Sequence, residues 1–181
     1  MSKEEIITKL IPVFRHYGYE GATVSRLSAA TGLKKASLYH HFQGGKEQMA
    51  EAVLEQIGNW IEENIFIPLR SPGTVRDRIL AMTESIDKFY ESGQAPCILA
   101  VMSLGEADNL FHQRLEASLK RWLDELTRVV EETGVTPEVA KIRAEDAMML
   151  IQGALVLVRV TNTIEPFKRA MVKIPQVLLG D

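Results

Sequence analysis

The chain has 181 residues, of which 46% are hydrophobic and 25% are charged, so it can bury a core and is not disordered. Its single cysteine, Cys97, excludes an internal disulfide framework and suits a reducing compartment. The net charge is −3, but residues 1–50 carry +3 and the remainder carries −6, an asymmetry expected when one end of a protein faces phosphates.

No membrane segment is predicted from the sequence. The N-terminal stretch MSKEEIITK lacks an apolar signal core. The longest apolar run, Ala147–Val158, contains Gln152 and is well short of the roughly 20 residues needed to cross a bilayer. We therefore expect a soluble cytoplasmic protein, and we expect no cofactor and no metal.

Helical periodicity begins at the N-terminus. Ser2 and Glu5 have the spacing of a capping box, and apolar residues recur at helical spacing from Ile6 to Phe14. A first helix is predicted to end at Gly18, because glycine commonly terminates helices.

Two short helices joined by a glycine turn follow. Thr23 can cap the first of them, Gly32 stands where it must stop, and the second is predicted over residues 35–42. The second helix buries Leu38 and Phe42, which are four residues apart. Its other sides carry donors and short polar groups suited to phosphates and base edges, namely Lys35, Ser37, Tyr39 and His40.

The rest of the chain predicts further helices separated by turns. A long fourth helix should fade near Pro68, a turn covers residues 70–74, and a fifth helix should end near Ser92 and Gly93. The later helices are predicted over 98–105, from a cap at Asp108 or Asn109 to Gly134, from the Thr136-Pro137 start signal over 138–162, and over 166–179. The fold class is therefore all-α with about nine helices.

The predicted helix 138–162 becomes apolar nearly all round in its second half. Such a helix must be buried on all sides, by its own core on one side and by something else on the other. It is either a central core helix or part of an interface.

Residues 22–49 closely resemble the helix-turn-helix of the TetR family of transcriptional regulators. The matching residues are Ala22-Thr23-Val24, Leu27-Ser28, Thr31-Gly32-Leu33, Leu38-Tyr39-His40-His41-Phe42 and Lys46-Glu47-Gln48-Met49. The Gly44-Gly45-Lys46-Glu47 variant is similar to the LmrA/YxaF-type branch of drug-resistance repressors. The resemblance implies an N-terminal three-helix DNA-binding domain, residues 1–48, joined by a long helix to a helical effector-binding and dimerisation domain, residues 49–181.

Roles for single residues at the DNA-binding end follow from the same resemblance. It implies that Lys35, Ser37 and His40 reach base edges and that the small Ala36 permits close approach to DNA. It assigns the phosphate contacts to Thr23, Lys34, Tyr39, His41 and Lys46. Two of these have alternatives, because Tyr39 can be a core aromatic that supports the turn and His41 can brace the helix end. Lys34 replaces the usual polar cap of this helix, so either that cap is weaker or the contact is electrostatic instead.

The resemblance also implies a homodimer on double-stranded operator DNA. Members of the family dimerise through their last two long helices, here 138–162 and 166–179, with candidate contacts Ala147, Ile151, Leu155, Val158, Phe167, Met171 and Val177. A two-fold dimer predicts a palindromic operator. The function implied is that of a repressor released when a small molecule binds the C-terminal domain, although the residues do not distinguish a repressor from an activator.

Candidate residues for the effector pocket are apolar and aromatic, which favours a lipophilic effector. They are Trp60, Phe89, Tyr90, Met102, Phe111, Met148, Met149 and Gln152. An apolar stripe is what every packed helix shows, so ordinary core is the more common role for each of them. Gln152 is a lone amide in an apolar run and must hydrogen-bond something.

The residues also allow two other classes of function to be formulated, an enzyme or metal site and a plain interaction module. An enzyme or a metal site could use Cys97 with His112, or Glu106 with Asp108 and His112. The sequence has no HExxH, no glycine-rich phosphate loop, no CxxC and no serine-centred elbow, which argues against catalysis. A plain helical interaction module would leave the basic N-terminal end and the Tyr39-His40-His41 cluster unexplained.

Overall fold

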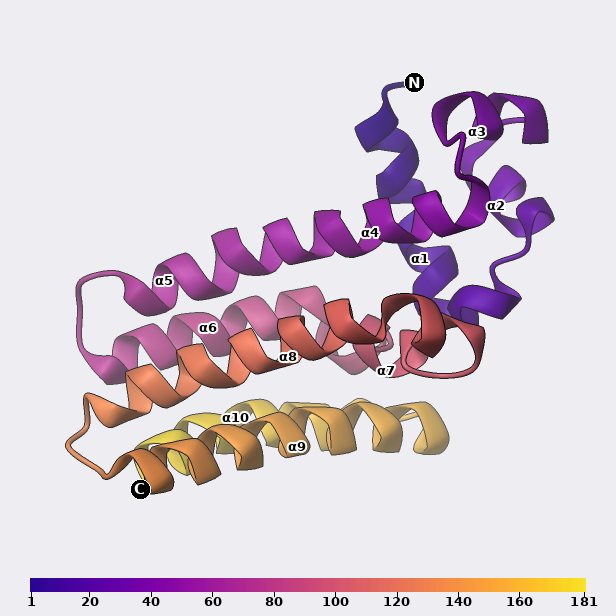
Figure 1. The fold of residues 1–181 in the computed structure, drawn as a ribbon. Helices are drawn as coiled ribbons and strands as arrows, with labels where there is room; N and C mark the ends of the chain where they lie inside the picture. Colours follow the sequence, from indigo (N-terminus) through magenta and orange to yellow (C-terminus); the bar gives the residue numbers. More distant parts are fainter. The chain divides into compact units, whose positions relative to one another are not determined.

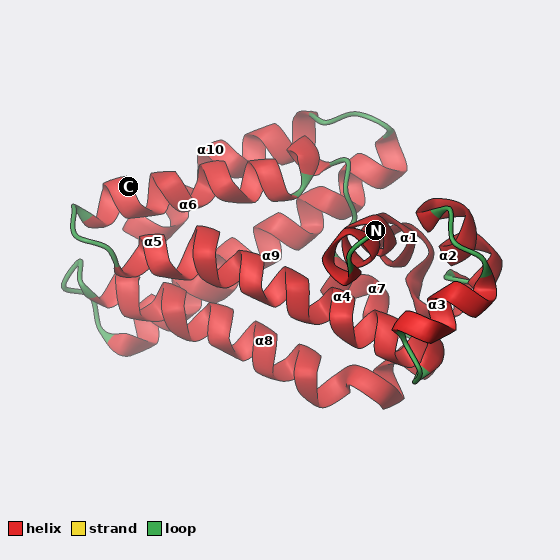
Figure 2. Ribbon diagram, turned by 90° about the horizontal axis from the view of Figure 1, so that it is seen from above, coloured by secondary structure: helices red, strands yellow, loops and turns green.

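A computed structural model describes residues 1–181, and every regular element in it is a helix (Figures 1 and 2). This confirms the predicted all-α class. The elements in chain order are α1 (Lys3–Gly21), α2 (Val24–Thr31), α3 (Lys35–His41), α4 (Gly45–Ile61), the π-helix η1 (Glu62–Phe66), α5 (Ile67–Arg70), α6 (Val75–Phe89), the 3₁₀-helix η2 (Glu91–Gly93), α7 (Ile98–Met102), α8 (Glu106–Glu131), α9 (Pro137–Thr161) and α10 (Glu165–Leu179).

The chain forms two compact units. Unit 1 consists of residues 1–60 and 98–115, and unit 2 consists of residues 61–97 and 116–181. Residues 98–115, which the sequence places in the C-terminal domain, therefore pack with the N-terminal helices. The division into a DNA-binding domain, residues 1–48, and an effector-binding and dimerisation domain, residues 49–181, stays a prediction.

The first helix starts as the sequence predicts. The Ser2 hydroxyl accepts a hydrogen bond from the Glu5 N–H (3.1 Å), and the Glu5 carboxylate accepts one from the Ser2 N–H (2.8 Å). Gly18 leaves the helical region, with φ 65° and ψ −174°, which is where the helix was predicted to end. The chain resumes a helical course to Gly21, so α1 carries a kinked C-terminal extension that the sequence did not suggest.

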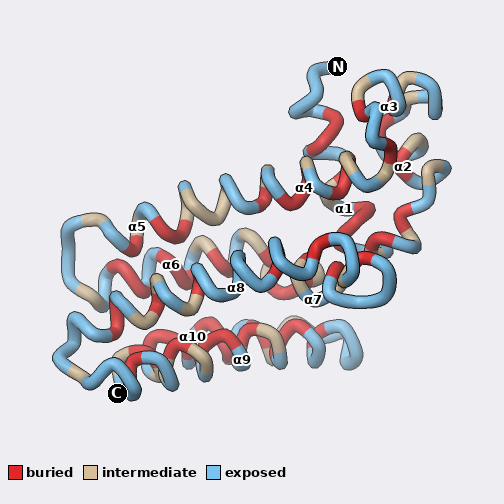
Figure 3. The backbone as a smooth tube through the Cα atoms, in the orientation of Figure 1, coloured by how far each residue is buried: buried red, intermediate tan, exposed pale blue.

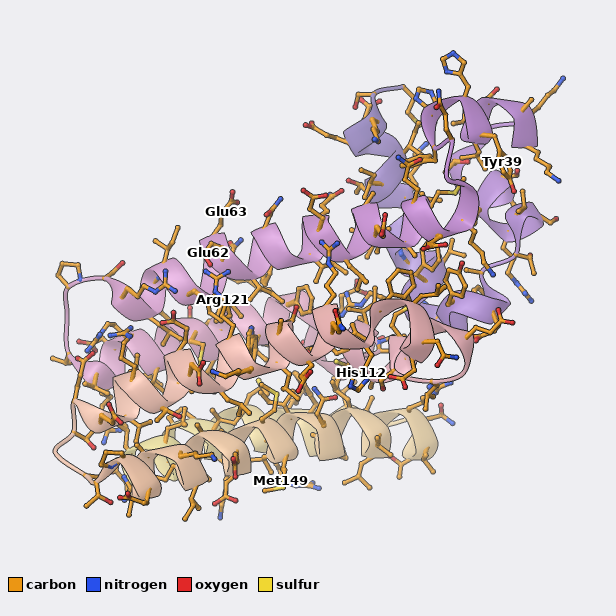
Figure 4. The ribbon with its side chains drawn as sticks, in the orientation of Figure 1. Tyr39, Glu62, Glu63, His112, Arg121 and Met149 are labelled. Atoms are coloured by element: carbon orange, nitrogen blue, oxygen red, sulfur yellow. The ribbon has the colours of Figure 1, made fainter.

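The predicted long fourth helix changes its hydrogen-bonding pattern before it ends. α4 stops at Ile61, and η1 follows as a π-helix up to α5, which contains Pro68. Pro68 has no N–H to donate to the carbonyl of residue 64, and a π-segment is one way in which a helix accommodates such a gap. Glu62 in η1 pairs with Arg70 (3.1 Å) and with Arg121 of α8, which lies beside it in Figure 4.

The predicted start of the long helix α8 was wrong. Asp108 and Asn109 lie inside its first turn, because α8 already begins at Glu106. The N–H of Glu106 donates to the carboxylate of Glu20 (2.5 Å), which is 86 residues away in the sequence. A cap supplied by a distant segment leaves no local signal.

In unit 2, η2 leads the chain away from α6 through a tight turn. Gly93 has φ +91°, and a Cβ at this position would lie 2.7 Å from Cβ of Phe167. Glycine is therefore required at this position for two reasons: the positive φ disfavours other residues, and α10 leaves no room for a side chain.

Helices α9 and α10 form the C-terminal helix pair of unit 2 and pack along each other (Figure 1). The Thr136 hydroxyl accepts a hydrogen bond from the Val139 N–H (3.4 Å), and Pro137 occupies the first turn, as predicted. Asn162 ends α9 in the left-handed conformation. Buried and exposed stretches alternate along both helices (Figure 3).

None of the helices combines the length and the apolar character that a membrane span requires.

Candidate DNA-binding surface

The turn between α2 and α3 is built from local contacts. The Thr23 hydroxyl accepts a hydrogen bond from the Arg26 N–H (3.3 Å), which caps α2. Gly32 ends α2 with φ 73°, and its N–H donates to the Ser28 carbonyl (2.9 Å). No atom lies within 4 Å of a Cβ built at this position, so backbone conformation rather than space is what favours glycine.

Helix α3 has one buried and one exposed side. Leu38 and Phe42 have no exposed surface, as predicted, and they fix α3 on the core of unit 1. The predicted DNA contacts are distributed over the other sides, with Lys34, Lys35, Ala36, Tyr39 and His40 exposed and Ser37 and His41 half-buried. Six of the nine predicted contacts therefore lie on α3, and a seventh, Lys34, stands at its N-cap.

The N-terminus of α3 lacks a side-chain cap. Lys34 stands at the N-cap position and makes no capping hydrogen bond. The missing hydrogen bond agrees with a weaker cap, and an electrostatic contact from Lys34 stays a prediction.

Tyr39 combines features of both of its predicted roles. Its side chain is 37% exposed, and Figure 4 shows it on α3. Its Cε1 would lie 3.3 Å from a Cβ at Gly45, and the Lys35 Nζ lies 5.6 Å from its ring centroid. The ring thus lines the Gly45 turn and also borders the basic side of α3.

Lys46 lies in a different setting from the α3 residues. It is half-buried in the first turn of α4, and its Nζ is 4.0 Å from the ring centroid of Tyr19. Burial raises the pKa of Tyr19, and the nearby carboxylates of Glu47, Glu106 and Glu20 raise it further. The ammonium group of Lys46 is held against this buried ring, and its contact to a phosphate stays a prediction.

Arg26 is a cation that the sequence did not single out. Its Nη1 donates to the Gly21 carbonyl (2.9 Å), and its guanidinium lies 4.3 Å from the ring centroid of Tyr17, an exposed side chain. Tyr17 lies in α1 and Arg26 lies in α2. Because they belong to different helices, helical periodicity does not predict their contact.

The predicted effector-pocket residues divide between the two units. Trp60, Met102 and Phe111 belong to unit 1, whereas the others belong to unit 2. Met149 is 62% exposed on the outward side of α9 (Figure 4), which does not suit a pocket lining.

A small polar cluster surrounds the one cysteine in unit 2. The Tyr90 hydroxyl donates to Cys97 Sγ (3.5 Å), and the Gln152 amide donates to the same sulfur (3.4 Å). Gln152 also lies 3.9 Å from Sδ of Met148. The amide of Gln152 thus has the hydrogen-bond partner that its apolar surroundings demand, and the buried cysteine is a structural acceptor.

Most of the predicted dimer contacts lie inside the core of the single chain. The side chains of Ala147, Ile151, Leu155, Val158, Phe167 and Met171 are buried in the core of a single chain, and Val177 is half-buried. The exposed apolar side chains of α9 and α10 are different ones, namely Val139, Ile142, Met149, Val156, Leu157, Val160 and Val172. The periodicity of α9 identified the helix, but a helix that is apolar all round does not show which side faces its own core.

The residues proposed for catalysis or metal binding do not form a centre. His112 pairs with Asp108 (2.9 Å) one turn away on the surface of α8, and no group of three or more potential metal-ligating side chains occurs in the chain.

Comparison with known proteins agrees with this geometry. Residues 6–53 match the profile described as "Bacterial regulatory proteins, tetR family", and residues 74–173 match the profile "Transcriptional regulator LmrA/YxaF-like, C-terminal domain". The HTH-type transcriptional regulator LmrA of Bacillus subtilis is 23% identical over 98% of this chain and 96% of its own length.

Solved structures share the fold over almost the whole chain. A TetR transcriptional regulator from Chloroflexus aurantiacus matches with a TM-score of 0.77 and 25% identity, covering 95% of this chain and 91% of that one. A TetR transcriptional regulator from Legionella pneumophila matches with a TM-score of 0.83 and 20% identity, covering 97% and 96%. The chain therefore belongs to the TetR family of transcriptional regulators and carries a C-terminal domain of the LmrA/YxaF-like type.

Proposed function

We propose that this regulator is a repressor that binds a palindromic operator as a homodimer and leaves it when a small lipophilic molecule binds the helical body. The observation that carries the proposal is the exposed side of α3, opposite the buried Leu38 and Phe42. Lys35 and His40 offer donors for base edges, and the small Ala36 lets the helix approach the DNA closely. As a protein that acts on the chromosome, it belongs in the cytoplasm.

An unpartnered seam on α9 supports the homodimer. Positions 139, 142, 146, 149, 153, 156 and 160 follow one another at alternating spacings of three and four, and all are apolar side chains except Asp146 and Gly153. This is the spacing of a helix seam that packs against another helix. Nothing lies within 4 Å of a Cβ built at Gly153, so the seam has an open position where a second helix can come close.

The effector is proposed to contact unit 2 near Tyr90 and Gln152. Phe89 stacks edge-on against Tyr90 with a centroid separation of 4.9 Å, and Tyr90 lies at 6.0 Å from Phe167 in the same manner. Aromatic rings around two hydrogen-bonding groups suit a flat apolar molecule with a few polar atoms. An effector releases DNA only if it binds the DNA-incompetent state more tightly, and a difference of about 1 to 3 kcal/mol would change operator affinity about 5- to 150-fold.

The test is selection of bound fragments from a randomised DNA pool by the purified protein at about 0.15 M salt, close to physiological ionic strength. An inverted repeat should be enriched by the wild-type protein and by the control variant Lys173→Ala, which removes an exposed charge from α10. The variant Lys35→Ala/His40→Ala should enrich nothing.

A wild-type pool that matches the input has two explanations, which a second selection separates. The protein is unfolded and refolded to strip any bound molecule, and the selection is repeated. Enrichment after refolding supports an effector that had occupied the protein. Continued failure would contradict the proposed function.

A further inference from the structure

The segment 98–115 packs directly on the DNA-binding helices within unit 1. Helix α7 lies against α1, and a Cβ built at Gly18 would be 3.5 Å from the Val101 carbonyl. The ring of Tyr19 meets the ring of Phe111 edge-on, with centroids 5.6 Å apart. The kinked end of α1 is therefore the surface that receives α7 and the start of α8.

Glu20 supplies the polar contact at this junction. Its carboxylate accepts the N–H of Glu106 at the first residue of α8 (2.5 Å). Gly105 precedes that residue with φ +63°, and a Cβ there would collide with the Glu20 carboxylate. The absence of a side chain at Gly105 is thus what allows Glu20 to reach the helix end.

The Glu20 carboxylate is also attracted by the positive charge of Lys46 in the first turn of α4. Hydrogen bonds from its own backbone N–H and from those of Glu106 and Ala107 lower the pKa of Glu20, and the charge of Lys46 lowers it further. Lys46 opens α4, and its Nζ rests on the ring of Tyr19, the residue next to Glu20. The ends of three helices, α1, α4 and α8, therefore share one charged cluster, which also contains Glu47.

We propose that Glu20 is a positioning residue that couples the start of α8 to the DNA-binding helices. When DNA binds, a phosphate attracts the Lys46 ammonium away from the Tyr19 ring and the Glu20 carboxylate. Loss of this nearby positive charge changes the strength of the hydrogen bond that Glu20 accepts from the Glu106 N–H at the start of α8. Since α8 continues to Glu131 in unit 2, it connects this contact to the part of the chain proposed to bind the effector. Coupling between two sites is reciprocal, so a change at α8 must also affect DNA binding. This inference rests on the proposed function.

The test is amide hydrogen exchange of peptides covering residues 103–110, measured in the full chain with and without the selected DNA duplex. In the wild-type protein, DNA should change the exchange of the Glu106 and Ala107 amides. In Glu20→Ala these amides should exchange about tenfold faster without DNA, as expected for the loss of a helix cap, and should no longer respond to DNA.

Two further variants separate the hydrogen bond from the charge. Glu20→Gln keeps an acceptor oxygen and loses the charge, so it should retain slow exchange and lose the response to DNA. Glu51→Ala removes an exposed carboxylate from α4 in the same unit and should respond as the wild type does. Unchanged exchange in peptides covering α3 shows that each variant remains folded.

Either of two results would overturn the coupling. One is wild-type exchange at residues 103–110 that is identical with and without bound DNA, and the other is a Glu20→Ala protein that responds as the wild type does. Failure of the proposed function is seen separately, as a wild-type protein that retains no DNA, and it would remove the basis of the coupling as well.

Discussion

Lys35 and Lys46 carry the same charge in different surroundings. Lys35 is exposed on α3, whereas Lys46 is half-buried and lies over the Tyr19 ring. A cation over an aromatic face is stabilised by about 0.5 to 2 kcal/mol, and a phosphate has to compete with that interaction. The two lysines should therefore contribute differently to DNA binding, Lys35 to the choice of sequence and Lys46 to affinity alone.

Replacing Lys46 by alanine should weaken binding to all DNA sequences alike. Loss of one phosphate contact lowers the slope of log affinity against log salt by about one. The measurement is a titration of the selected duplex and of a scrambled duplex at several salt concentrations. Lys9→Ala, which removes an exposed lysine from α1, is the matched control. An unchanged slope in Lys46→Ala would show that Lys46 serves the Tyr19 contact and not DNA.

The sequence predicts the position of some side chains of the DNA-binding surface and not of others. The arrangement of Leu38 and Phe42 against Lys35 and His40 was predictable, because a helical repeat of four residues separates buried from exposed positions. The place of Lys46 against Tyr19 was not, because it depends on how α4 meets the end of α1.

At the scale of the helices, α6 is tied to its neighbours by one buried arginine. Arg78 donates to the Leu69 carbonyl at the end of α5 (2.8 Å) and pairs with Glu132 just after α8. Hydrogen bonds from Arg78 lower the pKa of Glu132 from its ordinary value of 4.5. The pair therefore stabilises the fold above that pH, and the stabilisation is lost as pH falls through the lowered pKa.

Replacing Glu132 by glutamine should lower the free energy of unfolding by about 1 kcal/mol near neutral pH, a value that allows for the partial exposure of the carboxylate. Urea unfolding of the variant and the wild type should differ at about pH 7, and the difference should shrink as pH falls through the lowered pKa of Glu132, because the protonated carboxyl loses its charge pairing with Arg78. Glu131→Gln, an exposed neighbour, should behave as the wild type over the same pH range. A difference that is as large at low pH would assign the effect to packing.

The sequence predicts helix ends that are fixed by neighbouring residues, but it does not predict ends that are fixed by residues far away in the chain. The capping box at Ser2, the stop at Gly32 and the start at Thr136 all depend on residues within one turn, and the structure contains each of them. The start of α8 depends on Glu20, and the outward side of α9 depends on where α10 packs. Neither is encoded in a short window of sequence.

For the whole molecule, the central expectation is a two-fold dimer with two copies of α3. The charge of +3 on residues 1–50 and −6 on the remainder agrees with DNA binding at the N-terminal end of each copy. The exposed seam of α9 is the surface that we expect a second copy to cover, because the side chains of Ala147, Ile151 and Leu155 are buried in the single chain.

A charge placed in the seam should separate the two copies. Val156 is 61% exposed in the single chain, so Val156→Glu should fold normally and yet place a carboxylate in the apolar interface. Light scattering should give about twice the chain mass of 20.3 kDa for the wild type and the single mass for the variant, with loss of operator binding. Leu80→Glu, at an exposed position of α6, should remain dimeric. A dimeric Val156→Glu protein would place the interface elsewhere.

The claim that α3 reads DNA in two symmetric copies is tested most directly by repeating the DNA selection with Lys35→Met. This variant keeps most of the apolar stem and removes the donor from an exposed position. The recovered inverted repeat should lose its preference at the same position in both half-sites and keep it elsewhere. A motif identical to that of the wild type, or a change in one half-site only, would contradict the account.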